Sequence, residues 1–239
     1  MADDLQTTPG GRFGVPSADA STGSADEPGR AAAPVHETDP LVLEGPTLTL
    51  RYAAPDDADR LFELAGDPQV TRWFSWGPYT DREQPRSYIA SLGAKRDRGE
   101  LLDFLVVHRE DGPIGVTGLS ELARRDGRAT VGTWFAAPWW GSGANRESKA
   151  ILAALAFRRL GINRLTAWAN VENTRSQAAL EGVGFRREGV LHAWHRHGEE
   201  VHDVFVFGLV RDDWKTSPLA GVPVQIRGTP PPVWELDRR

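Results

Sequence analysis

The sequence has no cysteine among its 239 residues. This absence excludes disulfide bonds, iron–sulfur clusters, cysteine-based zinc sites and every mechanism that uses a thiol nucleophile. Long apolar runs are also missing, because stretches such as residues 150–157 are far shorter than the roughly 20 residues that cross a bilayer. The N-terminal residues lack the apolar core of a signal peptide. We therefore expect a cytoplasmic protein that neither spans a membrane nor is secreted.

The chain has no excess of positive charge, since its net charge is -5. Residues 1–40 hold seven of the 33 acidic residues and two of the 28 basic ones, so residues 41–239 carry 26 of each. A nucleic-acid-binding face needs basic residues in excess to neutralise phosphates. The balance therefore argues against a general nucleic-acid binder. The hydrophobic content of 40% is enough to build a core.

Composition divides the chain into three segments. Residues 1–40 contain five Gly, five Pro and one aromatic residue, Phe13, which is too little apolar surface to offset chain entropy. We predict a disordered acidic tail there and a folded domain over residues 41–215. Residues 216–239 form a Pro-rich extension with few N–H donors for a β-ladder, although Trp234 is available to dock on the domain.

Hydrophobic periodicity predicts alternating strands and helices in the central segment. Strands are expected at residues 47–51, 103–108, 114–122, 129–136, 165–169, 185–195 and 201–209. Helices are expected at residues 58–65, 81–98 and 173–180, together with an Ala- and Leu-rich helix that ends near Gly161. The last two strands form a hairpin through His197-Gly198. This mixture predicts an α/β protein with a twisted mixed sheet covered by helices.

A glycine-bearing loop, Trp140-Gly141-Ser142-Gly143-Ala144, lies between a predicted strand and a predicted helix. Unpaired N–H groups and the helix dipole favour an anion at such a junction, so a phosphate site is one interpretation. A tight strand-to-helix turn is the other. The loop is not a Walker loop, because no Gly-Lys-Ser/Thr follows, and the third glycine of a dinucleotide fingerprint is missing.

Several short motifs follow one another in a specific order between residues 132 and 214. They are Pro138-Trp139-Trp140-Gly141-Ser142-Gly143 with Glu147, Gly161-Ile162-Asn163-Arg164-Leu165, Asn173 with Ser176, Gly184-Phe185 with Glu188-Gly189, and Asp203. Together they resemble the GNAT N-acetyltransferase superfamily, in the branch typified by RimJ and RimL. The resemblance covers roughly residues 46–215. It implies a GNAT-like sheet that binds acyl-CoA at a splay between two central strands.

The resemblance implies an acetyl-CoA-dependent N-acetyltransferase that acts by direct attack of a primary amine, without a covalent enzyme intermediate and without a metal. Acetyl-CoA is the implied co-substrate. The acceptor is a protein N-terminus or a small molecule such as an amino-containing antibiotic or a polyamine, and a homodimer is expected. The alternative is a catalytically degenerate acyl-CoA-binding module with a sensing or assembly role. Trp140 and Asn145 motivate it, because they depart from the family's loop pattern, Gln/Arg-x-x-Gly-x-Gly/Ala, at its first and last positions.

By the same resemblance, the strand and the loop hold CoA. The implied cofactor-binding residues are Phe135, Trp140, Gly141, Ser142, Gly143, Ala144, Asn145, Arg146 and Asn173. Residues 131–136 are implied to supply backbone groups to the pantetheine and one N–H to the thioester oxygen, where negative charge develops. The Asn145 side chain either donates to a phosphate or weakens binding. Arg146 and Lys149 either balance phosphate charge or form a solvated face.

Ser176 and His195 are the implied catalytic residues. The spacing of Asn173 and Ser176 fits a helix cap, and the resemblance also puts the serine hydroxyl near the CoA sulfur, as a donor to the leaving thiolate. His195 stands where RimL-like enzymes carry a carboxylate that assists deprotonation of the amine, a task open to an imidazole. The other interpretation of His195 is a half-exposed hairpin residue. Glu188 and Asp203 are the next candidates for the base.

Two further groups of side chains are candidates for binding a metal or an acceptor. His192, His195, His197 and His202 lie close in sequence, but strand alternation sends His192 to the face opposite His195 and His197, so we expect no metal site. Aromatic walls suit a flat or cationic ligand. Trp73 and Trp76 lie in a segment that borders the substrate in the resembled family. The resemblance therefore implies that Trp73, Trp76 and Trp134 line the acceptor pocket.

Overall fold

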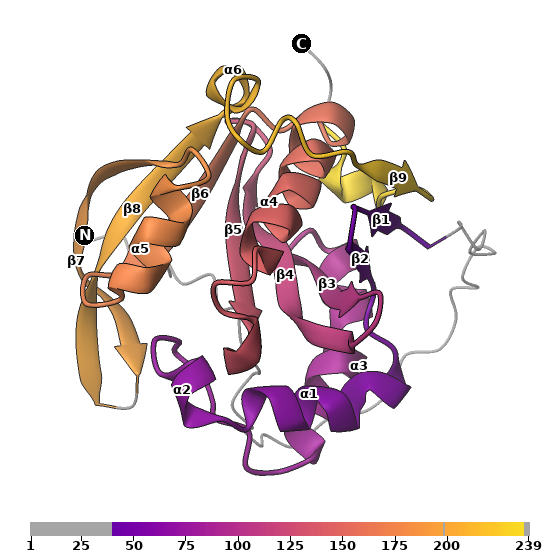
Figure 1. Ribbon diagram of the computed structural model, residues 1–239, viewed down its shortest axis with the longest axis vertical. Helices are drawn as coiled ribbons and strands as arrows, with labels where there is room; N and C mark the ends of the chain where they lie inside the picture. The colour runs from indigo at the N-terminus through magenta and orange to yellow at the C-terminus, as the bar shows by residue number, and fades with distance from the viewer. Residues whose placement is uncertain (1–39, 198, 237–239) are drawn as a thin grey trace, which may run out of the picture.

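The computed structural model describes residues 40–197 and 199–236, and in this part of the chain nine strands form one sheet with helices on both faces (Figure 1). The strands are Val42–Glu44 (β1), Leu48–Arg51 (β2), Leu101–His108 (β3), Gly112–Ala123 (β4), Arg128–Phe135 (β5), Arg164–Asn170 (β6), Arg186–His197 (β7), Glu200–Val210 (β8) and Gln225–Arg227 (β9). The helices are Ala58–Ala65 (α1), Pro68–Thr71 (α2), Glu83–Asp97 (α3), Ala144–Ala154 (α4), Thr174–Glu181 (α5) and Arg211–Trp214 (α6). None of these described helices is long and apolar enough to cross a membrane.

The strand order is β7-β8-β6-β5-β4-β3-β2-β1-β9. Only β5 and β6 pair in parallel, and the α4 crossover connects them. The other neighbouring strands are antiparallel. The α/β class predicted from the sequence is confirmed.

The two parallel strands separate part of the way along their length. β5 pairs with β6 only from Arg128 to Thr130, opposite Arg164 to Thr166. Beyond this point β5 stays paired with β4 as far as Phe135, and β6 stays paired with β8. The strands therefore diverge, and the β6-facing backbone edge of residues 131–135 is left outside the β5–β6 ladder.

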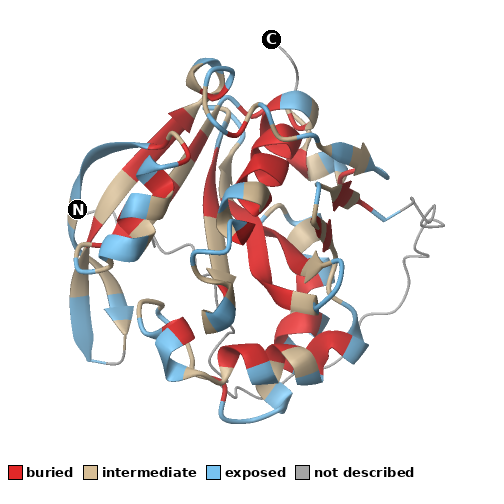
Figure 2. Ribbon diagram, in the orientation of Figure 1, coloured by how far each residue is buried: buried red, intermediate tan, exposed pale blue. Residues whose placement is uncertain are grey.

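Each face of the sheet has its own hydrophobic core, because successive side chains of a strand point to opposite faces. Leu101 and Leu105 of β3 pack in the cluster that includes residues of α1 and α3. Leu102 and Phe104 pack in the larger cluster with α4. Figure 2 shows the buried residues concentrated in α4 and the central strands, whereas β7 is mostly exposed.

The elements predicted from periodicity form, with boundaries that differ from the predicted ones by at most two residues. The helix after the glycine loop differs in its last turn, because it is α-helical only to Ala154 and continues as a π-helical turn over Leu155–Arg159. The short elements β1, α2, α6 and β9 were not predicted. Residues 1–39 of the predicted tail lie outside the described residues, so that assignment stays a prediction.

The segment after residue 215 contributes three residues to a β-ladder, although its prolines leave few N–H donors. β9 pairs with β1 through Val42, Leu43 and Glu44 at the edge of the sheet. Trp234 is 0% exposed, and its Nε1 donates to the carbonyl of Arg96 at 3.0 Å. The prolines flank the three-residue strand instead of interrupting it, so the extension packs on the folded domain.

Candidate active site

The glycine loop at the start of α4 is open on its outer side. Gly141 and Gly143 have φ angles of 76° and 95°, which are unfavourable for other residues, and Gly143 is the N-cap of α4. A Cβ atom added to either glycine would meet no atom within 4 Å. The positive φ angles give the tight turn, and the open space allows a ligand to approach the helix N-terminus, where backbone N–H groups favour an anion.

A cavity of about 360 Å³, here called the loop cavity, lies beside this turn. Its lining includes Gly141, Gly143, Asn145, Arg146 and Phe135 from the predicted CoA-binding set. Ser142 and Ala144 do not line it. Ser142 Oγ donates to the Trp139 carbonyl and accepts from the Ala144 N–H, so these two residues shape the turn.

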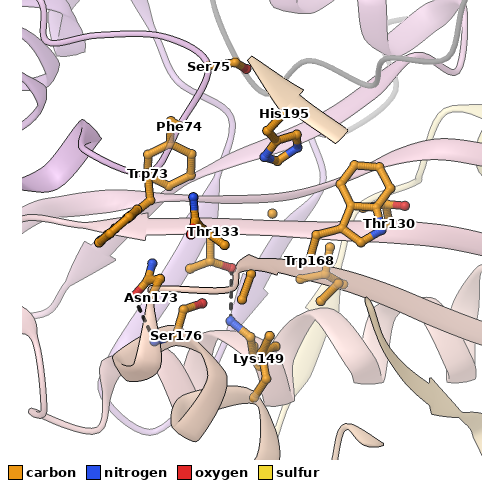
Figure 3. A pocket seen from close by; sticks show the side chains of 16 residues that line it. Trp73, Phe74, Ser75, Thr130, Thr133, Lys149, Trp168, Asn173, Ser176 and His195 are labelled. Atoms are coloured by element: carbon orange, nitrogen blue, oxygen red, sulfur yellow. Dashed lines mark hydrogen bonds between the residues drawn. The ribbon is translucent and has the colours of Figure 1, made fainter. Parts of the chain in front are cut away.

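A second cavity of about 110 Å³, here called the histidine cavity, contains His195 and Trp168 (Figure 3). Seven residues line both cavities: Trp73, Phe74, Thr133, Lys149, Asn173, Ser176 and Leu180. Strand divergence makes this arrangement possible, because β5 and β6 contribute to the histidine cavity on either side of their opening. The two cavities therefore meet beside Ser176.

The predicted loop residue Trp140 has a cationic partner that the sequence analysis missed. The guanidinium carbon of Arg175 lies 3.4 Å from the centroid of the Trp140 ring, and Trp140 Nε1 donates to the Phe135 carbonyl at 2.9 Å. Arg175 belongs to the first turn of α5 and lines the loop cavity. A positive charge thus reaches the cavity from α5, at the point where the family pattern has Gln or Arg in the loop itself. The one feature of the sequence that could have pointed to Arg175 is that it directly precedes Ser176.

Lys149 is buried and Arg146 is exposed, so the two do not form one solvated face, which was one interpretation of the pair. Lys149 is 7% exposed, and its Nζ donates to Asn145 Oδ1 at 2.6 Å and to Thr133 Oγ1 at 3.4 Å. Burial lowers the pKa of Lys149 to about 8. Asn145 therefore directs its carbonyl oxygen toward Lys149, while Arg146 lines the loop cavity and donates to the Pro218 carbonyl.

Ser176 and His195 face the histidine cavity from opposite sides (Figure 3). Asn173 Oδ1 accepts the Ser176 N–H at 3.1 Å, which is the predicted cap of α5. His195 is half-buried on β7, and its ring contacts Trp168 edge-on at 5.8 Å between centroids. Burial lowers the pKa of His195, the Glu121 carboxylate opposes this shift, and His202 adds to it. His195 is therefore disposed to be a neutral imidazole, and hence a proton acceptor, near pH 7.

The three tryptophans expected at the acceptor site have different surroundings. Trp73 lines both the loop cavity and the histidine cavity. Trp134 lines the loop cavity, and its ring lies 5.9 Å from that of Trp76. Trp76 lines neither of these cavities. Trp76 lines a smaller cavity together with Phe74, and the centroids of the two rings are 5.5 Å apart.

The remaining acidic residues of the motifs have structural partners. The Glu147 carboxylate accepts from Thr47 N–H and Oγ1 and from Leu48 N–H, which fixes the start of β2. Glu188 forms an ion pair with Arg164, which lowers the pKa of Glu188. Asp203 accepts from Ala193 N–H and contacts His192 Nδ1 at 2.8 Å. None of the three is among the lining residues of the two cavities.

A metal site was not expected from the histidine spacing. Within residues 40–197 and 199–236, no group of three or more His, Cys, Asp or Glu side chains is arranged to hold a metal ion.

Comparison with known proteins identifies the family. The Acetyltransferase (GNAT) domain matches residues 47–186. The uncharacterized N-acetyltransferase p20 of Bacillus licheniformis is 31% identical over 168 residues, which cover 70% of this chain and 94% of the relative. Mycobacterium smegmatis RimJ in complex with CoA-disulfide superposes with a TM-score of 0.63 at 23% identity, over 77% of this chain and 91% of RimJ. The microcin C7 self immunity acetyltransferase MccE, in complex with acetyl-CoA and AMP, gives a TM-score of 0.64 at 21% identity, over 69% of this chain and 93% of MccE.

This chain therefore belongs to the GNAT acetyltransferase family, as the order of its motifs predicted. The family takes its acetyl group from acetyl-CoA, and the residues of this chain fit that donor. Two glycines with open space, two arginines and the end of β5 that lies outside the β5–β6 ladder all adjoin one cavity.

Proposed function

We propose that the protein transfers the acetyl group of acetyl-CoA directly to a primary amine of a small molecule or a protein N-terminus. The observation that carries this proposal is the meeting of the loop cavity and the histidine cavity at Ser176, Lys149 and Thr133. One cavity opens onto an anion-binding helix N-terminus and the other contains a half-buried imidazole. A donor and an acceptor entering from the two sides would meet there.

The loop cavity suits the donor. Its glycine turn and helix N-terminus favour the pyrophosphate, and Arg146 and Arg175 add positive charge. The pantetheine would then run along the β5 edge that β6 leaves free, with Phe135 beside it. A backbone N–H of that edge would stabilise the negative charge that develops on the thioester oxygen.

The histidine cavity suits the acceptor. The amine nitrogen attacks the thioester carbonyl carbon, the carbon–sulfur bond breaks, and CoA leaves as a thiolate. The Ser176 hydroxyl donates a hydrogen bond to that sulfur, and neutral His195 accepts the proton that the amine loses. Lys149 adds a positive charge at the junction of the cavities, where the thiolate forms.

Release of free thiol from acetyl-CoA in the presence of a panel of amines tests the proposal. We expect thiol release with at least one amine class and a loss of roughly 100-fold in kcat for Ser176→Ala, within the range of a single polar catalytic group. Ser91→Ala is the matched control, because its hydroxyl bonds only to the Tyr88 carbonyl among the described residues. Tight acetyl-CoA binding without thiol release for any amine would instead favour the degenerate CoA-binding module.

A further inference from the structure

A third and smaller cavity lies next to the histidine cavity, toward α3. We call it the aspartate cavity; its volume is about 20 Å³, and Phe74, Trp76, Tyr79, Asp103, Gly132 and Trp134 are among its lining residues. Phe74, Gly132 and Thr133 line the histidine cavity as well. The aspartate cavity also shares Phe74, Thr133 and Trp134 with the loop cavity, so it adjoins the place where the other two cavities meet. Its volume suits one water molecule or one ammonium group of similar size.

Asp103 has a buried carboxyl group in which only one of the two oxygens accepts a hydrogen bond from the described residues. The residue is 4% exposed, and its Oδ2 accepts the Tyr88 hydroxyl hydrogen at 2.6 Å. Oδ1 has no hydrogen-bond partner among the described residues. Burial raises the pKa of Asp103 to about 7, and the Tyr88 hydrogen bond only partly offsets this shift. A buried carboxyl group with an unsatisfied oxygen costs stability, and a bound cation would remove that cost.

The residues that follow Asp103 across the sheet are glycines. Asp103 of β3 is paired with Gly118 of β4, which is paired with Gly132 of β5. A Cβ atom at Gly118 would lie 2.0 Å from Asp103 Oδ1. Gly132 lies just beyond the point where β5 leaves β6. The carboxyl group thus occupies the space above Gly118, and Gly132, which has no side chain, lies between it and the opening of the sheet.

Aromatic rings form the rest of the pocket. The centroid of the Trp76 ring lies 5.5 Å from that of Phe74, 5.5 Å from that of Tyr79 and 5.9 Å from that of Trp134. Aromatic faces attract cations, and a carboxylate adds opposite charge. Trp76 Nε1 also lacks a hydrogen-bond partner within the described residues, so a water molecule that accepts from Trp76 and donates to Asp103 is the competing occupant.

We propose that Asp103 and the surrounding aromatic rings bind a second cationic group of the acceptor while its reacting amine lies in the histidine cavity. The preferred acceptors are then diamines or longer polyamines, not monoamines. This inference rests on the proposed transfer to an amine. It adds a specificity-determining residue that lies outside the CoA-binding loop and outside the Ser176 and His195 pair.

A length series of diamines tests the inference. Diamines from 1,3-diaminopropane to 1,6-diaminohexane are compared with the n-alkyl monoamines of equal carbon number, by thiol release from acetyl-CoA. We expect kcat/KM for the best diamine to exceed that of its monoamine by at least tenfold, well above the factor of two for two equivalent amines. Asp103→Asn should lower this ratio about tenfold. Asp126→Asn is the matched control, because it makes the same change at an exposed carboxylate that lines none of the three cavities, and it should preserve the ratio.

An equilibrium measurement separates this inference from the proposed function. The same amines are added to the CoA-bound protein, and the melting temperature is measured. A larger shift with the diamine than with the monoamine, lost in Asp103→Asn and kept in Asp126→Asn, would support the pocket even if no amine were acetylated. If diamine and monoamine give equal shifts, or if Asp103→Asn lowers kcat/KM equally for both, the pocket holds only water and the inference is overturned.

Discussion

Replacing Lys149 by methionine is expected to stabilise the fold and to slow acetyl transfer. Lys149 is 7% exposed, and its hydrogen bonds within the described chain go to neutral oxygens of Asn145 and Thr133. Burial lowers its pKa from 10.5 to about 8. Since one pKa unit corresponds to roughly 1.4 kcal/mol, a charged Lys149 at pH 7 costs about 3 kcal/mol. Methionine fills the space without a charge, so we expect a gain of roughly 1 to 3 kcal/mol in the free energy of unfolding.

The pH dependence distinguishes this electrostatic cost from better packing. Because the pKa of Lys149 is lower in the folded state, the unfolded state binds more protons between about pH 8 and pH 10.5, and wild-type stability gains from this group as the pH rises through that window. The methionine variant lacks this pH-dependent contribution to stability, because methionine does not titrate. Its advantage should therefore be full below about pH 8 and shrink toward pH 10.

Urea denaturation at several pH values measures the difference directly, and thiol release measures activity. Lys215→Met is the matched control, because Lys215 is exposed and paired with Asp212, and it should give no stabilisation. We expect Lys149→Met to lower kcat, since a positive charge near the leaving thiolate is lost. A methionine variant that is less stable at pH 7, or whose advantage does not change with pH, would refute the reasoning.

Three further predictions address the loop, the base and the C-terminal segment. Gly143→Asp should abolish the rise in melting temperature that acetyl-CoA causes, whereas Gly112→Asp, with a similar φ of 71° and equally open space, should keep it; loss in both variants would show a general folding defect. Because burial lowers the pKa of His195, the wild-type rate should fall at acidic pH with an inflection below about 6.5, and His195→Ala should remove that inflection for a weakly basic amine. An unchanged profile in that variant would exclude His195 as the base. Trp234→Ala should lower the free energy of unfolding by about 3 to 5 kcal/mol in denaturation experiments, and a loss below about 1 kcal/mol would show that the segment contributes little to the core.

Local patterns were sufficient for the main elements of the fold. The apolar spacing of Leu61, Leu64 and Ala65 predicts the exact bounds of α1, because helix periodicity needs only neighbouring residues. β1 and β9 have three residues each, which is too short for an alternating pattern. Their pairing joins residue 42 to residue 227, and no local signal specifies such a contact.

The local geometry of the candidate site was predictable where it lies in a contiguous motif. The glycine loop and the Asn173 cap of Ser176 are contained in short stretches of sequence, and both were found. Burial of Lys149 was also accessible, because Asn145, Lys149 and Leu152 share one helical face and Leu152 is 0% exposed. The contact of Arg175 with Trp140 could not be predicted from the sequence, since it depends on how α5 packs against the loop.

The two buried charges lie on opposite faces of β5 and have opposite signs. Lys149 approaches Thr133 from the α4 side, and Asp103 lies in the row that ends at Gly132 on the α3 side. Each charge costs stability where it stands, and a core selected only for stability would replace both with apolar residues. Their signs match the two substrates of the proposed reaction, because the donor carries phosphates and leaves a thiolate, whereas the acceptor is a cation. The polarity across this strand therefore favours a site that draws an anion to one side of the opening and a cation to the other.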